Sequence, residues 1–155
     1  MSKSLRRVET ALAQAGIAAD IREVGQARTA AEAAAAAGCT LDQIVKSILF
    51  RGEGTGQVAL FLTAGGNRVS AEKASIVAGE PLGKADADLV RAQTGFAIGG
   101  VSPVGHLHPV RCYFDPRLSA FTTIWAAAGT PRHIFAIAPA ELLRITGAQV
   151  AAFTE

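Results

Sequence analysis

The sequence predicts a single α/β domain with a mixed β-sheet, spanning residues 1–155. Half of the residues are hydrophobic and only 18% are charged, which is enough apolar material for one core at this length. Helical patterns alternate with short apolar runs, and glycine turns join some of those runs into hairpins. Hairpins within such an alternation favour a mixed sheet over a simple doubly wound parallel sheet.

Helices are predicted where apolar spacing or capping residues mark both ends. Leu5, Val8 and Leu12 recur at helical spacing before Gly16, which ends the first helix. The run TAAEAAAAAG at 29–38 begins with a capping-box pattern and ends at a glycine. By the same signals, a helical turn is expected at 40–43 and helices at 70–79, at 86–95 with its start at Asp86 or Asp88, and at 139–147.

Strands are predicted from short runs rich in β-branched and aromatic residues. IVKSILF at 44–50 is expected to be a buried strand, and the GEGTG turn at 52–56 joins it to QVALFLT at 57–63 in a hairpin. A GTPR turn joins two further runs in the same way. The other predicted strands lie at 17–24, 96–98, 110–115, 122–129 and 133–138.

Composition narrows the functional classes without choosing one. The net charge of +2 and the pI near 8.8 permit contact with a polyanion but do not require it. Cys39 and Cys112 lack metal-ligand spacing and are expected to be reduced thiols, although a disulfide between them is compatible with the sequence. Since there is no signal-peptide pattern and no apolar run of about 18 residues, we expect a cytoplasmic protein without membrane spans.

Lys46 is the charged residue inside the apolar run QIVKSILF at 43–50. A buried amine is costly unless something offsets it, so two interpretations stand. Lys46 lies on an edge strand and extends its amine to solvent, or the strand holds the amine in a site where it binds an oxygen of a ligand. Strand alternation places Val45 and Ser47 on one face and Ile44, Lys46 and Ile48 on the other.

The segment GGVSPVGH at 99–106 is the second candidate for chemistry. Its glycines let the backbone approach a ligand closely and offer N–H groups to an oxyanion, although a tight turn between strands would use the same residues. It lacks the GK[ST] of a phosphate-binding loop, and Ser102 lacks the context of a nucleophile elbow. His106 and His108 share a face but have no third ligand nearby, so no metal is expected. His133 follows the GTPR turn and is a candidate pocket residue, while Asp115 is expected to cap a turn and Trp125 to lie in the core.

Taken together in this order, QIVKSILF and GGVSPVGH resemble the YbaK/EbsC family of aminoacyl-tRNA deacylases, which includes the editing domain of bacterial prolyl-tRNA synthetase. The segments ARTAAEAAAAAG, RVSAEKA, FDPRL and PAELLRITGAQVA agree with it, so the resemblance covers almost the whole chain. It implies a mixed, partly barrel-like sheet surrounded by helices. It also implies hydrolysis of the ester between a wrong amino acid and the terminal adenosine of a tRNA, without cofactor or metal.

The resemblance also assigns roles to residues. Lys46 would hold the terminal phosphate or ribose, the loop backbone would orient the ester carbonyl and water, and a ribose hydroxyl would help to activate the water. The implied catalytic set is Lys46, Gly99, Gly100, Ser102 and Pro103. The implied substrate-binding set is Ser47, Ile48, Val101, Gly105, His106 and His133. Strand faces suggest Ile48, Leu62 or Val101 as pocket walls.

Substrate and partners remain open to alternatives at this point. AAAGTPRHI lacks the aspartate of cysteinyl-specific members, and Ser47 stands where members that clear alanine often have asparagine. We therefore expect a small amino acid, removed from tRNA(Pro) in trans, with prolyl-tRNA synthetase as a possible partner. Candidate phosphate contacts are Arg68, Lys73 and Arg111. The alternative is a non-catalytic module of the same fold that binds aminoacyl-tRNA or a nucleotide; an oxidoreductase or transferase is disfavoured because there is no dinucleotide fingerprint.

Overall fold

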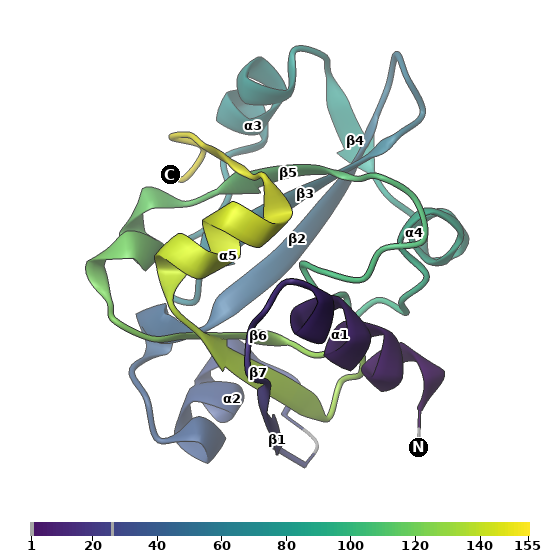
Figure 1. The fold of residues 1–155 in the computed structure, drawn as a ribbon. Helices are drawn as coiled ribbons and strands as arrows, with labels where there is room; N and C mark the ends of the chain where they lie inside the picture. The colour runs from purple at the N-terminus through teal and green to yellow at the C-terminus, as the bar shows by residue number, and fades with distance from the viewer. Residues whose placement is uncertain (1, 26) are drawn as a thin grey trace.

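The structure, a computed structural model, describes residues 2–25 and 27–155. Within these residues the chain forms two β-sheets with helices packed around them (Figure 1). The helices are α1 (Lys3–Gln14), α2 (Ala30–Ala37), α3 (Ala71–Ala78), α4 (Ala87–Thr94) and α5 (Pro139–Thr146), with the short 3-10 helices η1 (Leu41–Gln43) and η2 (Pro116–Ala120). The strands are β1 (Asp20–Glu23), β2 (Val45–Gly52), β3 (Val58–Ala64), β4 (Leu82–Lys84), β5 (Arg111–Phe114), β6 (Ile124–Ala127), β7 (His133–Ile137) and β8 (Gln149–Val150).

The sheet topology confirms the predicted mixed α/β domain. The smaller sheet has the order β1-β7-β6 and is antiparallel throughout. The larger sheet has the order β4-β2-β3-β5-β8, in which β2 and β3 form the predicted hairpin while β3 and β5 pair in parallel. A bridge between Ile44 and Trp125 links the two sheets, so the start of β2 lies beside β6.

Helix ends lie where the capping residues predict them. The Thr29 hydroxyl accepts a hydrogen bond from the backbone N–H of Glu32 at 3.1 Å, and Ser70 and Asp86 cap α3 and α4 in the same way. Such a cap satisfies one of the backbone donors that a helix leaves without an internal partner. Gly38 ends α2 with a φ of 73°, a left-handed conformation that costs glycine little.

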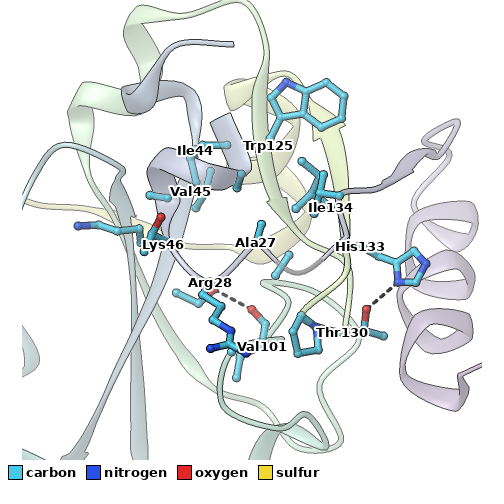
Figure 2. Close-up of a pocket in the computed structure, with 18 of the residues that line it drawn as sticks. Ala27, Arg28, Ile44, Val45, Lys46, Val101, Trp125, Thr130, His133 and Ile134 are labelled. Carbon is cyan, nitrogen blue, oxygen red and sulfur yellow. Dashed lines mark hydrogen bonds between the residues drawn. The ribbon is translucent and has the colours of Figure 1, made fainter. Parts of the chain in front are cut away.

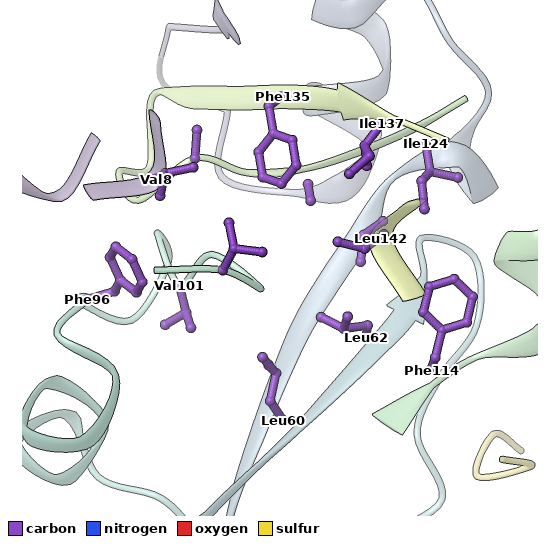
Figure 3. Close-up of a cluster of buried hydrophobic side chains, with 14 of the residues drawn as sticks. Val8, Leu60, Leu62, Phe96, Val101, Phe114, Ile124, Phe135, Ile137 and Leu142 are labelled. Carbon is purple, nitrogen blue, oxygen red and sulfur yellow. The ribbon is translucent and has the colours of Figure 1, made fainter. Parts of the chain in front are cut away.

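The main core lies between the two sheets and is closed by α1 and α5. Val8 of α1, Leu142 of α5, Phe114 of β5 and Phe135 of β7 meet there, each fully buried (Figure 3). A smaller cluster covers the opposite face of the larger sheet, where Phe61 stacks on Tyr113 with ring centroids 4.8 Å apart. The larger sheet is therefore covered on both faces, and all seven residues of β3 are buried.

Strand β2 is less buried than its sequence predicts. Val45 is buried, but residues 46 to 50 are only partly so. The cause is its position, because β4 pairs only with Phe50, Arg51 and Gly52 of β2. Within the described residues, positions 46 to 49 therefore pair only with β3, and the other edge of β2 is open. The predicted faces are confirmed, since Val45 packs in the main core and Ile48 packs in the cluster on the opposite face.

One predicted strand is wrong and two short strands were missed. Residues 96 to 98 form part of a loop, because the N–H of Phe96 donates to the Thr94 hydroxyl instead of to a neighbouring strand. The buried Phe96 ring instead anchors that loop in the core. Strands β4 and β8 have three and two residues, too few for a periodic signal. Cys39 and Cys112 are free thiols, as expected, and no helix in the described parts of the chain is long and apolar enough to span a membrane.

Candidate functional site

The open edge of β2 borders a cavity of about 370 Å³. Four parts of the chain meet around it, namely residues 24 and 27–33 before and within α2, the first half of β2, and two loops at 98–101 and 130–131 (Figure 2). Strands β6 and β7 supply the rest of the wall. The sheet link at Ile44 and Trp125 explains this convergence, because it brings β2 next to the smaller sheet.

A hydrogen bond joins the two segments that the sequence singles out. The Ser47 hydroxyl of β2 donates to the backbone carbonyl of Val101 at 2.7 Å, across 54 positions of sequence (Figure 2). Val101 is almost fully buried, so this bond satisfies a carbonyl that water reaches poorly. Strand β2, the lysine strand, and residues 99–106, the glycine–proline loop, are thus held together at the cavity.

The Lys46 side chain leaves the cavity wall and extends away from the cavity (Figure 2). Its amine donates a short hydrogen bond to the backbone carbonyl of Asn67, just after β3. Burial lowers the pKa of Lys46, as does the neighbouring Arg68, while Asp115 and Asp42 act in the opposite direction. The amine is therefore a partly desolvated cation with one other cation and two carboxylates close enough to act on its pKa.

Asp115 organises the backbone around that amine. One carboxylate oxygen accepts from the N–H of Arg117 at 2.9 Å, which confirms the predicted cap. The other oxygen accepts from the N–H of Ala64 at 3.1 Å and from the side-chain amide of Asn67 at 2.9 Å. The sequence gives no signal for these last two bonds, since they join β3 to a residue about fifty positions later. Asn67 is the residue near Lys46 that sequence reasoning missed.

The predicted loop residues divide between three environments. Gly99 and Val101 line the cavity with Lys46, Ser47 and Ile48. Ser102 is completely buried, and its hydroxyl accepts from the N–H of Val104 at 3.2 Å, so it does not face the cavity. Pro103, Gly105 and His106 lie on the other side of the loop, where they line a second hollow.

Two glycines of the loop have geometric reasons to be glycine. Gly99 has a φ of 95°, which other residues rarely adopt. A Cβ on Gly100 would lie 2.8 Å from the Cα of Thr130, so this residue packs directly against the backbone of the turn between β6 and β7. Close packing of these two loops closes one end of the cavity.

The two predicted histidines have different surroundings. His133 lines the cavity, and its Nδ1 lies 2.6 Å from the Thr130 hydroxyl (Figure 2). His106 is outside the cavity, and its Nε2 lies 2.6 Å from the Ser102 carbonyl. Burial lowers the pKa of His106, and Arg7 adds to this effect, whereas the Ser102 contact opposes it. His133 is thus the imidazole at the cavity, and His106 belongs to the support of the loop.

Small apolar side chains form the far wall of the cavity. Ala27, Ala30 and Ala33 face Ile44 and Trp125 there, all of them lining residues. Trp125 is in the core as predicted, but it also contributes to the wall. Ile48 and Val101 line the cavity as the strand faces suggest, whereas the third suggested residue, Leu62, is buried in the main core.

The three basic residues suggested as phosphate contacts also differ. Arg111 forms an ion pair with Glu80 at 2.8 Å, so its charge is already compensated within the fold. The Lys73 amine donates to the carbonyl of Thr154 at 2.9 Å. Arg68 is exposed and close enough to Lys46 to affect its pKa. Of the three, Arg68 is the one placed beside a predicted site residue.

Fold and site define a mixed α/β domain in which the open edge of β2, the strand of Lys46, and the glycine–proline loop border one cavity. The family model of the aminoacyl-tRNA editing domain matches residues 24–145, so the chain belongs to this family. It is also 33% identical over 148 residues to the uncharacterized protein YwhH of Bacillus subtilis (strain 168), covering 95% of this chain and 94% of that protein.

Two of the similar solved structures cover the whole chain. A crystal structure described as a candidate trans-editing enzyme for prolyl tRNA synthetase is 48% identical, with a TM-score of 0.92 over 100% of this chain and 99% of the other. A structure from work on epitope backbone grafting by computational design is 46% identical, with a TM-score of 0.93 and the same coverage. At these identities the likeness extends from the fold to the family that the sequence resembles.

Proposed function

We propose that the protein is a trans-editing hydrolase that removes a small, wrongly attached amino acid from a tRNA, with tRNA(Pro) as the expected carrier. One observation carries this proposal, namely the 2.7 Å bond from Ser47 to Val101 that joins the lysine strand to the glycine loop at one cavity. The match to the aminoacyl-tRNA editing domain supports the reaction class. The likeness to a candidate trans-editing enzyme for prolyl tRNA synthetase supports the choice of tRNA.

The aminoacyl group is expected to enter the cavity, where backbone groups lie beside the polar side chains of Arg28, Ser47, Thr130 and His133. The open edge of β2 offers N–H and C=O groups, and the loop at Gly99 offers further backbone groups beside them. Donors held in place by the fold can stabilise the negative charge that develops on an ester oxygen during hydrolysis. We therefore assign Gly99 and Val101 to the positioning of the ester, while Gly100, whose N–H donates to the Ala97 carbonyl at 3.0 Å, supports the loop.

Lys46 is assigned to the nucleotide and not to the acyl group. Its amine lies outside the cavity at the Asn67 carbonyl, near Arg68. A phosphate placed there would meet two cations, which suits the terminal phosphodiester of a tRNA. On this assignment Lys46 fixes the position of the substrate and does not act as a nucleophile.

The hydrolytic step needs a group that orients water. Among the described residues that line the cavity there is no carboxylate, and His133 is the imidazole. The ribose hydroxyl next to the ester is the proposed partner of the water. The water oxygen attacks the carbonyl carbon, the bond from that carbon to the ribose oxygen breaks, and a water proton ends on the ribose oxygen. The products are a free amino acid and an uncharged tRNA.

The cavity wall suggests which amino acids are accepted. Alanine side chains from α2 leave room for a small apolar group next to Trp125, while a larger group would have to displace that wall. Such selection by size suits a domain that must spare the correctly charged tRNA. A synthetase such as prolyl-tRNA synthetase is a proposed partner, and the cytoplasm, where tRNA is charged, is the proposed location.

A deacylation panel tests the proposal. Purified protein is incubated with tRNA(Pro) and tRNA(Ala) charged with alanine, cysteine, serine, threonine or 2-aminobutyrate, and release of the amino acid is followed over a buffer blank. Lys46→Ala should lower kcat/KM about 100-fold, because a misplaced substrate loses most of the benefit of orientation. Lys84→Ala, at an exposed lysine on β4, is the matched control and should keep the full rate.

Three outcomes are informative. Release by the wild type and not by Lys46→Ala supports both the reaction and the assigned residue. Release that survives Lys46→Ala at full rate contradicts the role of Lys46. If every charged tRNA binds but none is hydrolysed, the protein is the non-catalytic binding module of the same fold.

A further inference from the structure

The far side of the glycine–proline loop borders a second hollow that the proposed reaction does not use. It has two adjoining parts of about 450 and 520 Å³, which share Ala11, Gly105 and His106. One part runs along α1, which lies beside the loop between α4 and β5 (Figure 1). We call the two parts together the α1 groove. Its polar lining is Lys3, Arg6, Arg7, Thr10, Gln14, His106, His108 and Thr146.

The charge of the α1 groove is of one sign. Three cations come from α1, and in the described chain no carboxylate lines either part. This concentration is local, since the whole protein carries a net charge of only +2. Cations at this position are also unfavourable for the helix itself, because the amino-terminal end of a helix favours acidic residues, and the first turn of α1 has none. The helix alone gives no reason for these cations, but an anionic ligand would.

Arg7 ties the groove to the loop. Its Nε donates to the carbonyl of Gly105 at 3.0 Å, and its guanidinium lies 4.5 Å from the centroid of the Phe96 ring. These contacts commit Arg7 to the fold. Lys3 and Arg6 are exposed one turn apart on the same face of α1, with Thr10 one turn further. The groove therefore presents two exposed cations and a hydroxyl in a line that leads away from the loop.

We propose that the α1 groove binds the phosphodiester backbone of the RNA strand whose 3′ end enters the cavity. Lysine and arginine are the usual partners of phosphate oxygens, and threonine and glutamine can donate to phosphate or ribose oxygens. The loop connects the two places directly, because Val101 lines the cavity and Gly105 lines the groove. Residues 101–104 are buried, so the strand would pass over the surface around the loop, whose ends, four residues apart, lie within about 14 Å of each other.

This inference rests on the proposed function for the identity of the RNA, but its test does not require hydrolysis. The probe is an uncharged RNA hairpin with a single-stranded 3′ end, and the readout is its dissociation constant at several salt concentrations. The double variant Lys3→Ala/Arg6→Ala should raise the dissociation constant about tenfold at low salt. It should also reduce the slope of log affinity against log salt by about two, because each of the two removed cations neutralises one phosphate.

The control removes the same charge elsewhere. Arg51→Ala/Lys84→Ala changes two exposed cations on β2 and β4 and should leave the salt slope within about one of the wild type. Equal slopes for the two double variants would overturn the proposal. Thermal unfolding of both variants shows whether a loss of affinity follows from a loss of fold. If the wild type binds the hairpin but hydrolyses no charged tRNA, RNA binding by the α1 groove remains supported, and only the proposed deacylase activity is refuted.

A second readout separates the groove from the cavity. If the wild type is active, a short oligonucleotide that carries the same aminoacyl ester reaches the cavity but not the groove. The Lys3→Ala/Arg6→Ala variant should then raise KM for the full tRNA and leave the hydrolysis of the short substrate unchanged. Equal losses on both substrates would mean that these residues act through the fold, which contradicts the proposal.

Discussion

Replacing Ser47 by alanine tests the junction on which the site is built. The change removes the hydroxyl that donates to Val101 at 2.7 Å and adds no bulk. The Val101 carbonyl belongs to a residue that is only 2% exposed, so water restores the lost bond poorly. Leaving such a group unsatisfied costs about 1–3 kcal/mol of unfolding free energy. For a loss of about 2 kcal/mol in a protein of this size, Tm should fall by about 4–8 °C.

The matched control is Ser75→Ala on α3. Ser75 is also partly buried, and its hydroxyl donates to the Ala71 carbonyl at 2.8 Å and accepts from the N–H of Leu82 at 3.2 Å, but both bonds lie away from the cavity. Thermal or urea unfolding compares the stability of the two variants, and deacylation compares their rates. Both variants should lose stability, because each removes a bond to a backbone group, but only Ser47→Ala should also lose deacylation rate. If both variants match the wild type in stability and rate, the bond from Ser47 does not position the loop.

Three other perturbations have defined outcomes. Gly100→Ala would place a Cβ 2.8 Å from the Cα of Thr130, and this overpacking should cost about 1–3 kcal/mol in urea unfolding; an unchanged midpoint would contradict the packing of the two loops. Burial lowers the pKa of His106 below 6.5, so the unfolded chain binds the extra proton first. The unfolding free energy should therefore have its full value above pH 6.5 and decrease as the pH falls from the pKa of His106 in the unfolded chain to its lower pKa in the folded protein. His106→Gln should flatten this pH dependence, and equal slopes for variant and wild type would refute the role of His106. Burial raises the pKa of Cys112 to about 12, so native protein should label there with a thiol reagent far more slowly than urea-unfolded protein, and equal rates would refute its burial.

The sequence predicts most of the elements because their signals are local. Thr29, Ser70 and Asp86 cap helices at the predicted positions, and a glycine turn joins β2 to β3. These features depend on residues within a few positions of one another. The prediction that Lys46 and the glycine loop belong to one site came from a family resemblance and not from periodicity. The bond from Ser47 to Val101 supplies the physical link between the two segments.

What the sequence does not reveal depends on contacts between distant parts of the chain. Residues 96 to 98 have strand-like composition, but the bond from Phe96 to Thr94 and the burial of its ring make them an anchor for a loop. The split of the loop, with Val101 at the cavity and His106 behind it, depends on how α1 and the smaller sheet pack against it. The direction of the Lys46 amine likewise depends on Asn67, whose own position is set by Asp115.

The unpaired edge of β2 has a consequence for how such a site can change over time. An exposed strand edge is usually a hazard, because another chain can pair with it, and here the cavity walls enclose it. A reaction that depends on main-chain groups is unaffected by side-chain substitutions that preserve the strand. Under the proposed function, the alanines of α2 can then vary, and with them the acyl group that fits, without loss of the main-chain groups assigned to the ester. The proposed reaction would thereby stay the same while its specificity changes.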